Sequence, residues 1–203
     1  MDLYFSPLAC SLATRIAIYE AKADADFHRV DTRAGRTADG ADYTRINPKG
    51  LVPALKTDEG EVLTENAAIL QYIADRYPKA GLAPDGFERY RLQQWLSFIG
   101  AELHKTVFQP LFADIYSGDA KATARELAKR HFTYLHEHLE GREYLLDRFS
   151  VADCYLAAVL NWPQAVKLDM TPYPNVLAYR ERLMARPAVA KATQEEFGLY
   201  QAA

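Results

Sequence analysis

The first 31 residues contain a strand–helix–strand pattern, which constrains the fold more than any other feature of the chain. Leu3-Tyr4-Phe5 is a short apolar run typical of a strand. Leu12, Ile16 and Tyr19 then recur at the spacing of one helical face, and residues 27–31 alternate as a second strand does. Two strands joined through a helix lie parallel in one sheet. The sequence therefore predicts an α/β fold for this part of the chain.

The segment Ser6-Pro7-Leu8-Ala9-Cys10-Ser11 connects the first strand to the first helix. Cys10 and Ser11 thus lie at a helix start, where free backbone N–H groups and the helix dipole favour anions. A thiolate is stabilised at such a place, and the thiolate is the reactive form of cysteine. The alternative is that Cys10 is a small, inert, partly buried core residue. This stretch alone leaves both interpretations open.

Composition excludes several classes of protein. The 203 residues carry a net charge of −3 without a basic stripe, which argues against a nucleic-acid partner. No apolar run approaches the ~20 residues of a membrane span, and the first residues lack the regions of a signal peptide. The two cysteines, Cys10 and Cys154, lie too far apart to form a disulfide framework. We expect a reducing, cytoplasmic location and no membrane association.

Turn residues organise the chain between residues 32 and 60. Residues 32–42 have no apolar face and predict an exposed loop, with a short helix around 41–46. Pro53 interrupts a strand-like run, which requires either an edge position or a cis peptide bond. Asp58-Glu59-Gly60 predicts a hairpin turn between strands at 54–56 and 62–63.

A second helix of this region begins at Thr64-Glu65-Asn66. Glu65 in its first turn suits the helix dipole. We expect its buried face to carry Ala68, Ile69, Tyr72 and Ile73.

Two clusters of helix-breaking residues, 78–81 and 84–86, predict a domain boundary. We therefore expect a first domain over 1–77, a linker over 78–86 and an all-helical domain over 87–203. Tyr90, Trp95, Ile99, Leu103 and Val107 mark one long helix that ends before Pro110. Further helices are predicted over 121–139, from a serine cap at Ser150, over 174–184, and in a short piece from about 188.

Several histidines and one cysteine receive structural interpretations. His131, His136 and His138 are not spaced to place two ligands on one helical face, so we expect a solvated face and no metal site. His28 is expected at a strand surface, and Cys154 in an inert core.

Five motifs together resemble the cytosolic glutathione transferases, and among them the bacterial beta class. The resemblance covers nearly the whole chain and is specific as a combination. The matching segments are Ser6-Pro7 with Ala9-Cys10-Ser11, Asn47-Pro48-Lys49-Gly50, Val52-Pro53-Ala54-Leu55, Leu63-Thr64-Glu65 and Glu102-Leu103-His104-Lys105.

The resemblance implies a thioredoxin-like N-terminal domain, with a cis bond before Pro53, followed by an all-helical domain that forms the electrophile pocket. It implies that Val52 presents its backbone to glutathione as an added strand would. Glu65 and Asn66 would hold the γ-glutamyl end, since a carboxylate suits an ammonium group and helix-start N–H groups suit a carboxylate.

The resemblance also assigns chemical roles. Cys10, Ser11 and His104 would serve the glutathione sulfur, and Cys10 could form a mixed disulfide with it. Glu102 and Lys105 would lie at the glutathione site, or Glu102 would reach that of a partner subunit. The candidate walls of the electrophile pocket are Leu8, Phe108, Leu111, Phe112 and Tyr116.

The chain departs from the family pattern at three positions. A lysine is common near position 35, where this chain has Ala34-Gly35-Arg36, so Arg33 or Arg36 is a candidate to reach the glycine carboxylate of glutathione. Asn66 stands where Gly or Ser is usual, and its amide could add a hydrogen bond or crowd the site. Ser97 stands where Asn is frequent.

The leading hypothesis is a homodimeric enzyme that conjugates glutathione to small hydrophobic electrophiles, as in detoxification. A second hypothesis is a glutathione-dependent monothiol disulfide or peroxide reductase, because Leu12-Ala13 follow Ser11 where a dithiol enzyme would need another cysteine. A third is a transferase-like binding protein without turnover.

Overall fold

The computed structural model describes residues 1–202, which form two compact units. The first unit contains residues 1–83 together with the last helix of the chain, and the second contains residues 84–186. The elements of the first unit are β1 (Asp2–Phe5), α1 (Leu12–Glu20), β2 (Asp26–Asp31), β3 (Arg36–Thr37), η1 (Tyr43–Arg45), β4 (Ala54–Lys56), β5 (Val62–Thr64), α2 (Asn66–Arg76), η2 (Pro78–Ala80) and α9 (Pro187–Gln201).

The sheet of the first unit has the strand order β3-β2-β1-β4-β5. β1 pairs with β2 in parallel, with Leu3 opposite Phe27, and with β4 in antiparallel orientation. β4 and β5 form the hairpin, with Leu55 opposite Leu63. This mixed sheet confirms the predicted strand–helix–strand unit and the thioredoxin-like class of the domain.

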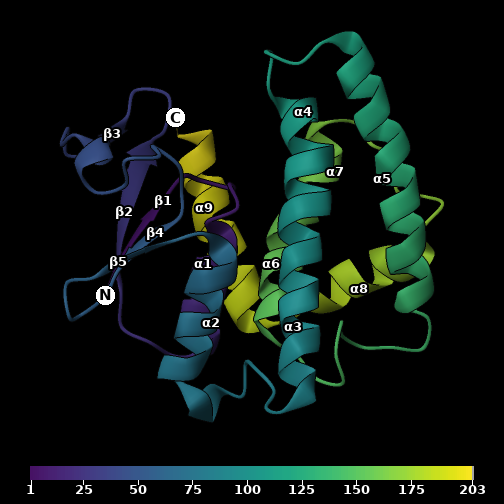
Figure 1. Ribbon diagram of the computed structural model, residues 1–203, viewed down its shortest axis with the longest axis horizontal. Helices are drawn as coiled ribbons and strands as arrows, with labels where there is room; N and C mark the ends of the chain where they lie inside the picture. The colour runs from purple at the N-terminus through teal and green to yellow at the C-terminus, as the bar shows by residue number, and fades with distance from the viewer. Residues whose placement is uncertain (203) are drawn as a thin grey trace. The chain divides into compact units, whose positions relative to one another are not determined.

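The helices α1, α2 and α9 lie together beside the sheet, and α1 packs against both others (Figure 1). α1 is buried over its first seven residues, Leu12 to Ile18, because neighbours cover it on several sides. The buried residues of α2 are Asn66, Ile69, Leu70, Ile73 and Ala74. Ala68 is exposed, so that part of the predicted face is wrong.

Residues 32–42 are not a plain loop, since they contain the two-residue strand β3. Thr37 of β3 pairs with Val30 and is buried. A strand of two residues is too short to produce an alternating pattern, so the sequence carried no signal for it.

The second unit is helical. Its elements are α3 (Phe87–Phe98), the π-helical segment η3 (Ile99–Phe108), α4 (Gln109–Phe112), α5 (Gly118–His138), α6 (Val151–Val159), α7 (Trp162–Ala165) and α8 (Pro174–Met184). α3, η3 and α4 follow one another without a break, so Pro110 lies inside the last helical piece and not beyond it. Tyr90, one of the residues that mark this helix, is 65% exposed, whereas Trp95 and Ile99 are buried.

A predicted cap begins α6. Ser150 accepts from the Ala152 N–H, and Asp153 accepts from the Ser150 N–H and hydroxyl, which completes a capping box. The Leu145 N–H and the Tyr179 hydroxyl also donate to Asp153, which is fully buried. Burial raises the pKa of Asp153, and these donors act in the opposite direction.

The predicted solvated face of histidines on α5 is wrong. His131 is buried, because its ring packs edge-on against Phe98. His136 Nδ1 accepts from the Asn175 N–H at 3.2 Å, and His138 Nε2 lies 2.9 Å from the Leu145 carbonyl oxygen. These rings connect α5 to neighbouring segments, which spacing along one helix does not reveal.

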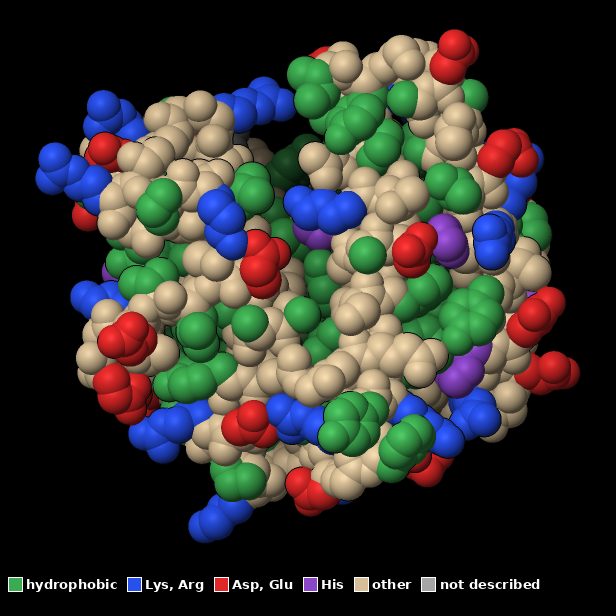
Figure 2. Space-filling model, viewed as in Figure 1, with side chains coloured by type: hydrophobic (Ala, Val, Ile, Leu, Met, Phe, Trp, Pro, Cys, Tyr) green, Lys and Arg blue, Asp and Glu red, His purple; other side chains and the backbone are tan. Residues whose placement is uncertain are grey.

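The division of the chain differs from the expected 1–77, 78–86 and 87–203. α9 runs for 15 residues and belongs to the first unit, because Arg15 of α1 forms ion pairs with Glu195 and Glu196. Within residues 1–202, no helix combines the length and apolar character needed to cross a membrane. Acidic and basic side chains are interspersed on the face shown in Figure 2.

Candidate functional site

The loop between β1 and α1 is a compact turn that positions Cys10. The Ser11 hydroxyl accepts from the Ser6 N–H and donates to the Ser6 carbonyl, both at 3.2 Å. Leu8 has a positive φ of 59°, a backbone conformation that side chains disfavour. Ser11 is the N-cap residue of α1 and is fully buried. Its hydroxyl is therefore occupied by the backbone of the same loop.

Cys10 lies beside the segment that precedes β4. Its Sγ is 3.2 Å from the Val52 carbonyl oxygen, a hydrogen bond that only the protonated thiol can donate. The Val52–Pro53 bond is cis, as predicted. The Leu51 carbonyl accepts from the Tyr43 hydroxyl at 2.8 Å and from Asn47 Nδ2 at 2.6 Å. These two buried side chains hold the approach to the cis bond, so that the half-buried Val52 is fixed next to the thiol.

The start of α2 carries an exposed carboxylate in a strained conformation. Glu65 has a φ of 71°, which is uncommon for a residue with a side chain. Lys49 forms an ion pair with Glu65, and its Nζ lies 2.8 Å from Thr64 Oγ1. The first backbone N–H groups of α2 follow immediately. A cation site and an anion site are thus adjacent at this helix end.

Asn66 connects this helix end to the cysteine loop. Its side chain is buried, and Nδ2 donates to the Cys10 carbonyl oxygen at 2.9 Å. Its Oδ1 accepts from Thr14 Oγ1 at 3.0 Å. The amide therefore bonds within the unit to α1, and the starts of α1 and α2 are joined by hydrogen bonds.

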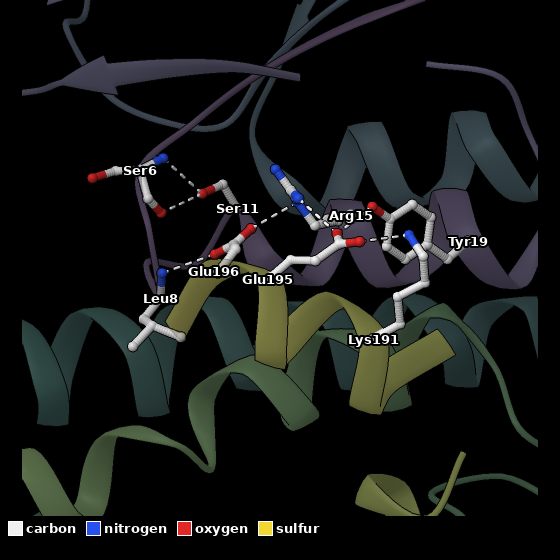
Figure 3. A network of polar contacts seen from close by, with 8 residues as sticks. All are labelled: Ser6, Leu8, Ser11, Arg15, Tyr19, Lys191, Glu195 and Glu196. Atoms are coloured by element: carbon white, nitrogen blue, oxygen red, sulfur yellow. Dashed lines mark hydrogen bonds and ion pairs between the residues drawn. The ribbon is translucent and has the colours of Figure 1, made fainter. Parts of the chain in front are cut away.

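A network of charged side chains joins α9 to the cysteine loop (Figure 3). Glu196 is fully buried, and its Oε2 accepts from the Leu8 N–H at 2.8 Å. Its Oε1 lies 3.1 Å from Arg15 Nε, but without the alignment of a hydrogen bond. Glu195 accepts from Arg15, Tyr19 and Lys191. The last helix of the chain thus holds the turn in front of Cys10.

Arg15 is the centre of this network. Its guanidinium lies over the Phe5 ring at 4.3 Å and over the Phe27 ring at 4.1 Å. Burial raises the pKa of Glu196 to about 7, while Arg15 and the Leu8 N–H act to lower it.

The predicted site residues of the second unit lie along η3. His104 Nδ1 is 2.9 Å from the Tyr155 hydroxyl, and its ring packs edge-on against Trp162. Glu102 Oε2 is 3.5 Å from His131 Nε2, and Lys105 is exposed. Burial lowers the pKa of His131, and Glu102 acts to raise it.

The predicted pocket residues differ in exposure. Phe108 is fully buried and packs against Phe112, Phe132 and Trp162, whereas Phe112 is 48% exposed. Leu8, in the first unit, is half-buried, as are Leu111 and Tyr116 in the second. The remaining polar candidates, Arg33, Arg36 and Ser97, are exposed, and Arg36 donates to the Gly40 carbonyl at 2.9 Å.

Sequence reasoning missed four side chains that support this site: Tyr43, Asn47, Lys49 and Glu196. Asn47 and Lys49 stood inside a recognised turn motif, and a turn motif before a cis proline is the signal that could have drawn attention to them. No local sequence pattern could have identified Glu196 as a supporting residue, because its partner Leu8 is 188 residues away. Within residues 1–202, no group of three His, Cys, Asp or Glu side chains is arranged to hold a metal ion.

A thioredoxin-like sheet with a cis proline beside a helix-start cysteine, followed by a helical unit, defines a class of two-domain thiol-handling proteins. Comparison with known proteins narrows this class. The glutathione S-transferase N-terminal domain family matches residues 2–75, and the C-terminal domain family matches residues 101–187. The chain is 40% identical to glutathione S-transferase GstA of Escherichia coli O157:H7, over 97% of this chain and 98% of that protein.

The fold of the chain is also similar to solved structures of glutathione S-transferases. A sphingomonad glutathione S-transferase complexed with glutathione is 49% identical, with a TM-score of 0.93 over 97% of this chain and 98% of that one. The beta class glutathione S-transferase of Sphingomonas chungbukensis is 47% identical, with a TM-score of 0.93 and the same coverage. The chain therefore belongs to the glutathione S-transferase family, in its bacterial beta class, and is a glutathione transferase.

The raised pKa of Glu196 predicts a pH-dependent stability. Between about pH 4.5 and 7 the folded chain binds a proton that the unfolded chain releases, so this contribution is full below pH 4.5 and lost as the pH rises through 7. Glu196→Gln does not titrate. We expect its unfolding free energy to gain about 2–3 kcal/mol on the wild type between pH 5 and pH 8, measured by urea unfolding.

The matched control is Glu126→Gln, which removes an exposed acid of α5. Its difference from the wild type should stay constant over the same pH range. A constant difference for Glu196→Gln as well would contradict the raised pKa.

Proposed function

We propose that this transferase conjugates the thiolate of glutathione to small hydrophobic electrophiles, in detoxification. The observation that carries the proposal is that Cys10 is hydrogen-bonded to Val52 and to Asn66, and that Glu65 directly precedes Asn66 at the start of α2. Its groups match glutathione in order. Glu65 suits the γ-glutamyl ammonium group, the start of α2 suits the adjacent carboxylate, the backbone of Val52 suits the peptide, and the cysteine loop suits the thiol.

The chemistry requires a thiolate. A free thiol with a pKa near ~8.5 is only a few per cent ionised at pH 7. The N–H groups at the start of α1 favour the charged sulfur, because they donate to an anion more strongly than to a neutral thiol. His104 is the second unit's candidate for assisting the sulfur, on the family resemblance. The thiolate then attacks an electrophilic carbon and forms the carbon–sulfur bond of the conjugate.

The two ends of glutathione would be held differently. Lys49 forms an ion pair with Glu65, and both side chains are exposed to solvent. The ammonium group of the ligand would therefore bind to a carboxylate that already has a cationic neighbour. For the glycine carboxylate, Arg33 and Arg36 are the candidates in the first unit. Both are exposed, and Arg36 would have to leave the Gly40 carbonyl. Glu102 and Lys105 remain candidates on the resemblance alone.

Glu65→Gln tests the γ-glutamyl site. The amide keeps the shape of the side chain but loses the charge that pairs with the ammonium group. We expect glutathione affinity to fall about 10- to 100-fold, measured by titration calorimetry on protein freed of bound thiol. Glu61→Gln, an exposed acid on the β4–β5 hairpin, is the control and should bind as the wild type does. Equal glutathione affinity for the two variants would show that the charge of Glu65 does not contribute to glutathione binding.

A glutathione-dependent disulfide or peroxide reductase is the second candidate function, because the Cys10 thiol lies at the candidate site and forms no disulfide within residues 1–202. It could form a mixed disulfide with glutathione. Cys10→Ala separates the two activities. We expect disulfide exchange and the mixed disulfide to vanish, while conjugation stays within about tenfold, because the backbone donors of α1 remain.

The measurements are mass spectrometry of the mixed disulfide and a conjugation assay with an electrophilic aryl halide. Cys154→Ala, in the core of α6, is the control and should keep both activities. Complete loss of conjugation in Cys10→Ala alone would show that the cysteine is required for it. A wild type that binds glutathione without turnover would favour the third reading, a binding protein.

We also propose a cytoplasmic homodimer. Within residues 1–202 neither cysteine forms a disulfide, and both are buried, which suits a reducing compartment. The rings of Trp95, Phe98, Tyr134 and His138 on α3 and α5 form an aromatic patch, in which Trp95 is buried and Tyr134, at 43%, is the most exposed ring. Apolar surface of this kind suits a subunit interface.

Tyr134→Glu tests the dimer. We expect sedimentation equilibrium to give twice the 22.9 kDa chain mass for the wild type and a mass closer to one chain for the variant. Ile115→Glu introduces the same charge at a side chain that is 87% exposed outside the patch, and it should remain dimeric. A monomeric wild type would contradict the proposal.

A further inference from the structure

The turn between β1 and α1 is strained at Leu8. The Ala9 N–H donates to the Ser6 carbonyl at 3.1 Å, so residues 6–9 form a β-turn with Leu8 in its third position. Leu8 has a φ of 59°, and a positive φ at this position favours glycine. The hydrogen bond of the turn does not use the Leu8 N–H. A strained conformation of this kind persists only where the surrounding structure holds it.

Glu196 of α9 supports the turn from the other end of the chain. Its Oε2 accepts from the Leu8 N–H at 2.8 Å (Figure 3). Glu196 is fully buried, so solvent does not reach its side chain while α9 is docked. α9 belongs to the first unit and packs against α1. One buried carboxylate therefore ties the strained turn to the last helix.

The groups that face Glu196 leave it imperfectly paired. Arg15 Nε of α1 lies 3.1 Å from Glu196 Oε1, but within residues 1–202 neither atom has a hydrogen-bond partner. Arg15 Nη1 donates to Glu195 at 3.1 Å. Tyr19 of α1 and Lys191 of α9 also contact Glu195. Glu196 thus faces one cation that it shares with Glu195, and a buried carboxylate in that position is costly to keep ionised.

The turn also restricts access to Cys10, which lies two residues after Leu8. Cys10 is 8% exposed, and its Sγ is 3.2 Å from the Val52 carbonyl oxygen. Thiol–disulfide exchange needs a direct approach to the sulfur, and so small an exposed surface restricts that approach. Opening of the turn would remove the restriction.

We propose that α9 is a latch on the cysteine loop: the contact of Glu196 with the Leu8 N–H keeps the turn closed, and ionisation of Glu196 releases it and exposes the Cys10 thiol. Burial raises the pKa of Glu196 from 4.5 to about 7 in the closed state, whereas the solvated carboxyl of the open state titrates near its ordinary value. The closed state therefore holds a proton that the open state releases. The latch is strongest below about pH 4.5 and weakens as the pH rises through 7.

The Leu8 N–H reports on the latch directly, because Glu196 holds it. We expect its hydrogen-exchange protection factor, followed by NMR and corrected for base catalysis, to fall about 10- to 100-fold from pH 5 to pH 8 in the wild type. Glu196→Gln keeps an acceptor for the N–H but does not titrate, so its protection factor should stay constant. Glu195→Gln is the matched control on the neighbouring residue. It keeps Glu196 and should follow the wild type.

Equal pH profiles in the wild type and Glu196→Gln would overturn the proposal. If Glu196→Gln does not fold, the wild type decides alone, because a protection factor that is constant from pH 5 to pH 8 would also overturn it. Low urea distinguishes the latch from unfolding of the whole chain. A local opening exposes little surface, so exchange at Leu8 should hardly depend on urea, whereas exchange at the fully buried Ile16 should accelerate with it. The same urea dependence at both amides would overturn a local latch.

Alkylation by iodoacetamide measures the consequence at the sulfur. In a Cys154→Ala background, Cys10 is the one thiol that remains. We expect the ratio of the wild-type rate to the Glu196→Gln rate to be near one at pH 5 and about tenfold or more at pH 8. A ratio near one at both pH values would overturn the proposal. These measurements need no glutathione, so failure of the latch and failure of the proposed function are distinguishable.

Discussion

The start of α1 is held from two sides by buried polar side chains, and the candidate site depends on this constraint. Asn66 of α2 bonds to the Cys10 carbonyl, and Glu196 of α9 bonds to the Leu8 N–H. Both contacts are to backbone groups in a turn that contains the strained Leu8. Removing Glu196 would take this acceptor from the Leu8 N–H. Removing Asn66 would leave the Cys10 carbonyl with the Ala13 N–H and would take the Oδ1 acceptor from the buried Thr14 hydroxyl, which is costly. The turn is therefore over-determined by helices on either side of it.

Local patterns predicted much of this structure. The parallel β1–β2 pair followed from two apolar runs around a helical period, and the cap of α6 followed from a serine and an aspartate three residues apart. The cis bond at Pro53 was one of two explanations for a proline in a strand-like run. In each case the residues that cause the feature are close together in the chain, so their pattern can be recognised in the sequence.

The features that could not be predicted are long-range. His131 is buried because Phe98 of another helix packs against its ring, although the residues near His131 in the sequence are polar. The side chain of Asn66 accepts a hydrogen bond from Thr14 of α1, and the residues next to Asn66 in the sequence do not indicate this contact. Glu196 faces a loop at the other end of the chain. Periodicity shows which side of an element is apolar, but the partner of a buried polar group is set by the packing of distant elements.

Because α9 packs in the first unit with residues 1–83, this unit is completed only after the second unit has been synthesised. Arg15 and the turn at Leu8 are synthesised early, whereas Glu195 lies 180 residues after Arg15 and Glu196 lies 188 residues after Leu8. The thioredoxin-like sheet can therefore form before α9 has been made, and during that interval the buried Arg15 lacks its two carboxylate partners. A nascent or truncated chain that lacks α9 would expose a cationic, incompletely packed surface, and the cysteine loop would be the part left unsupported.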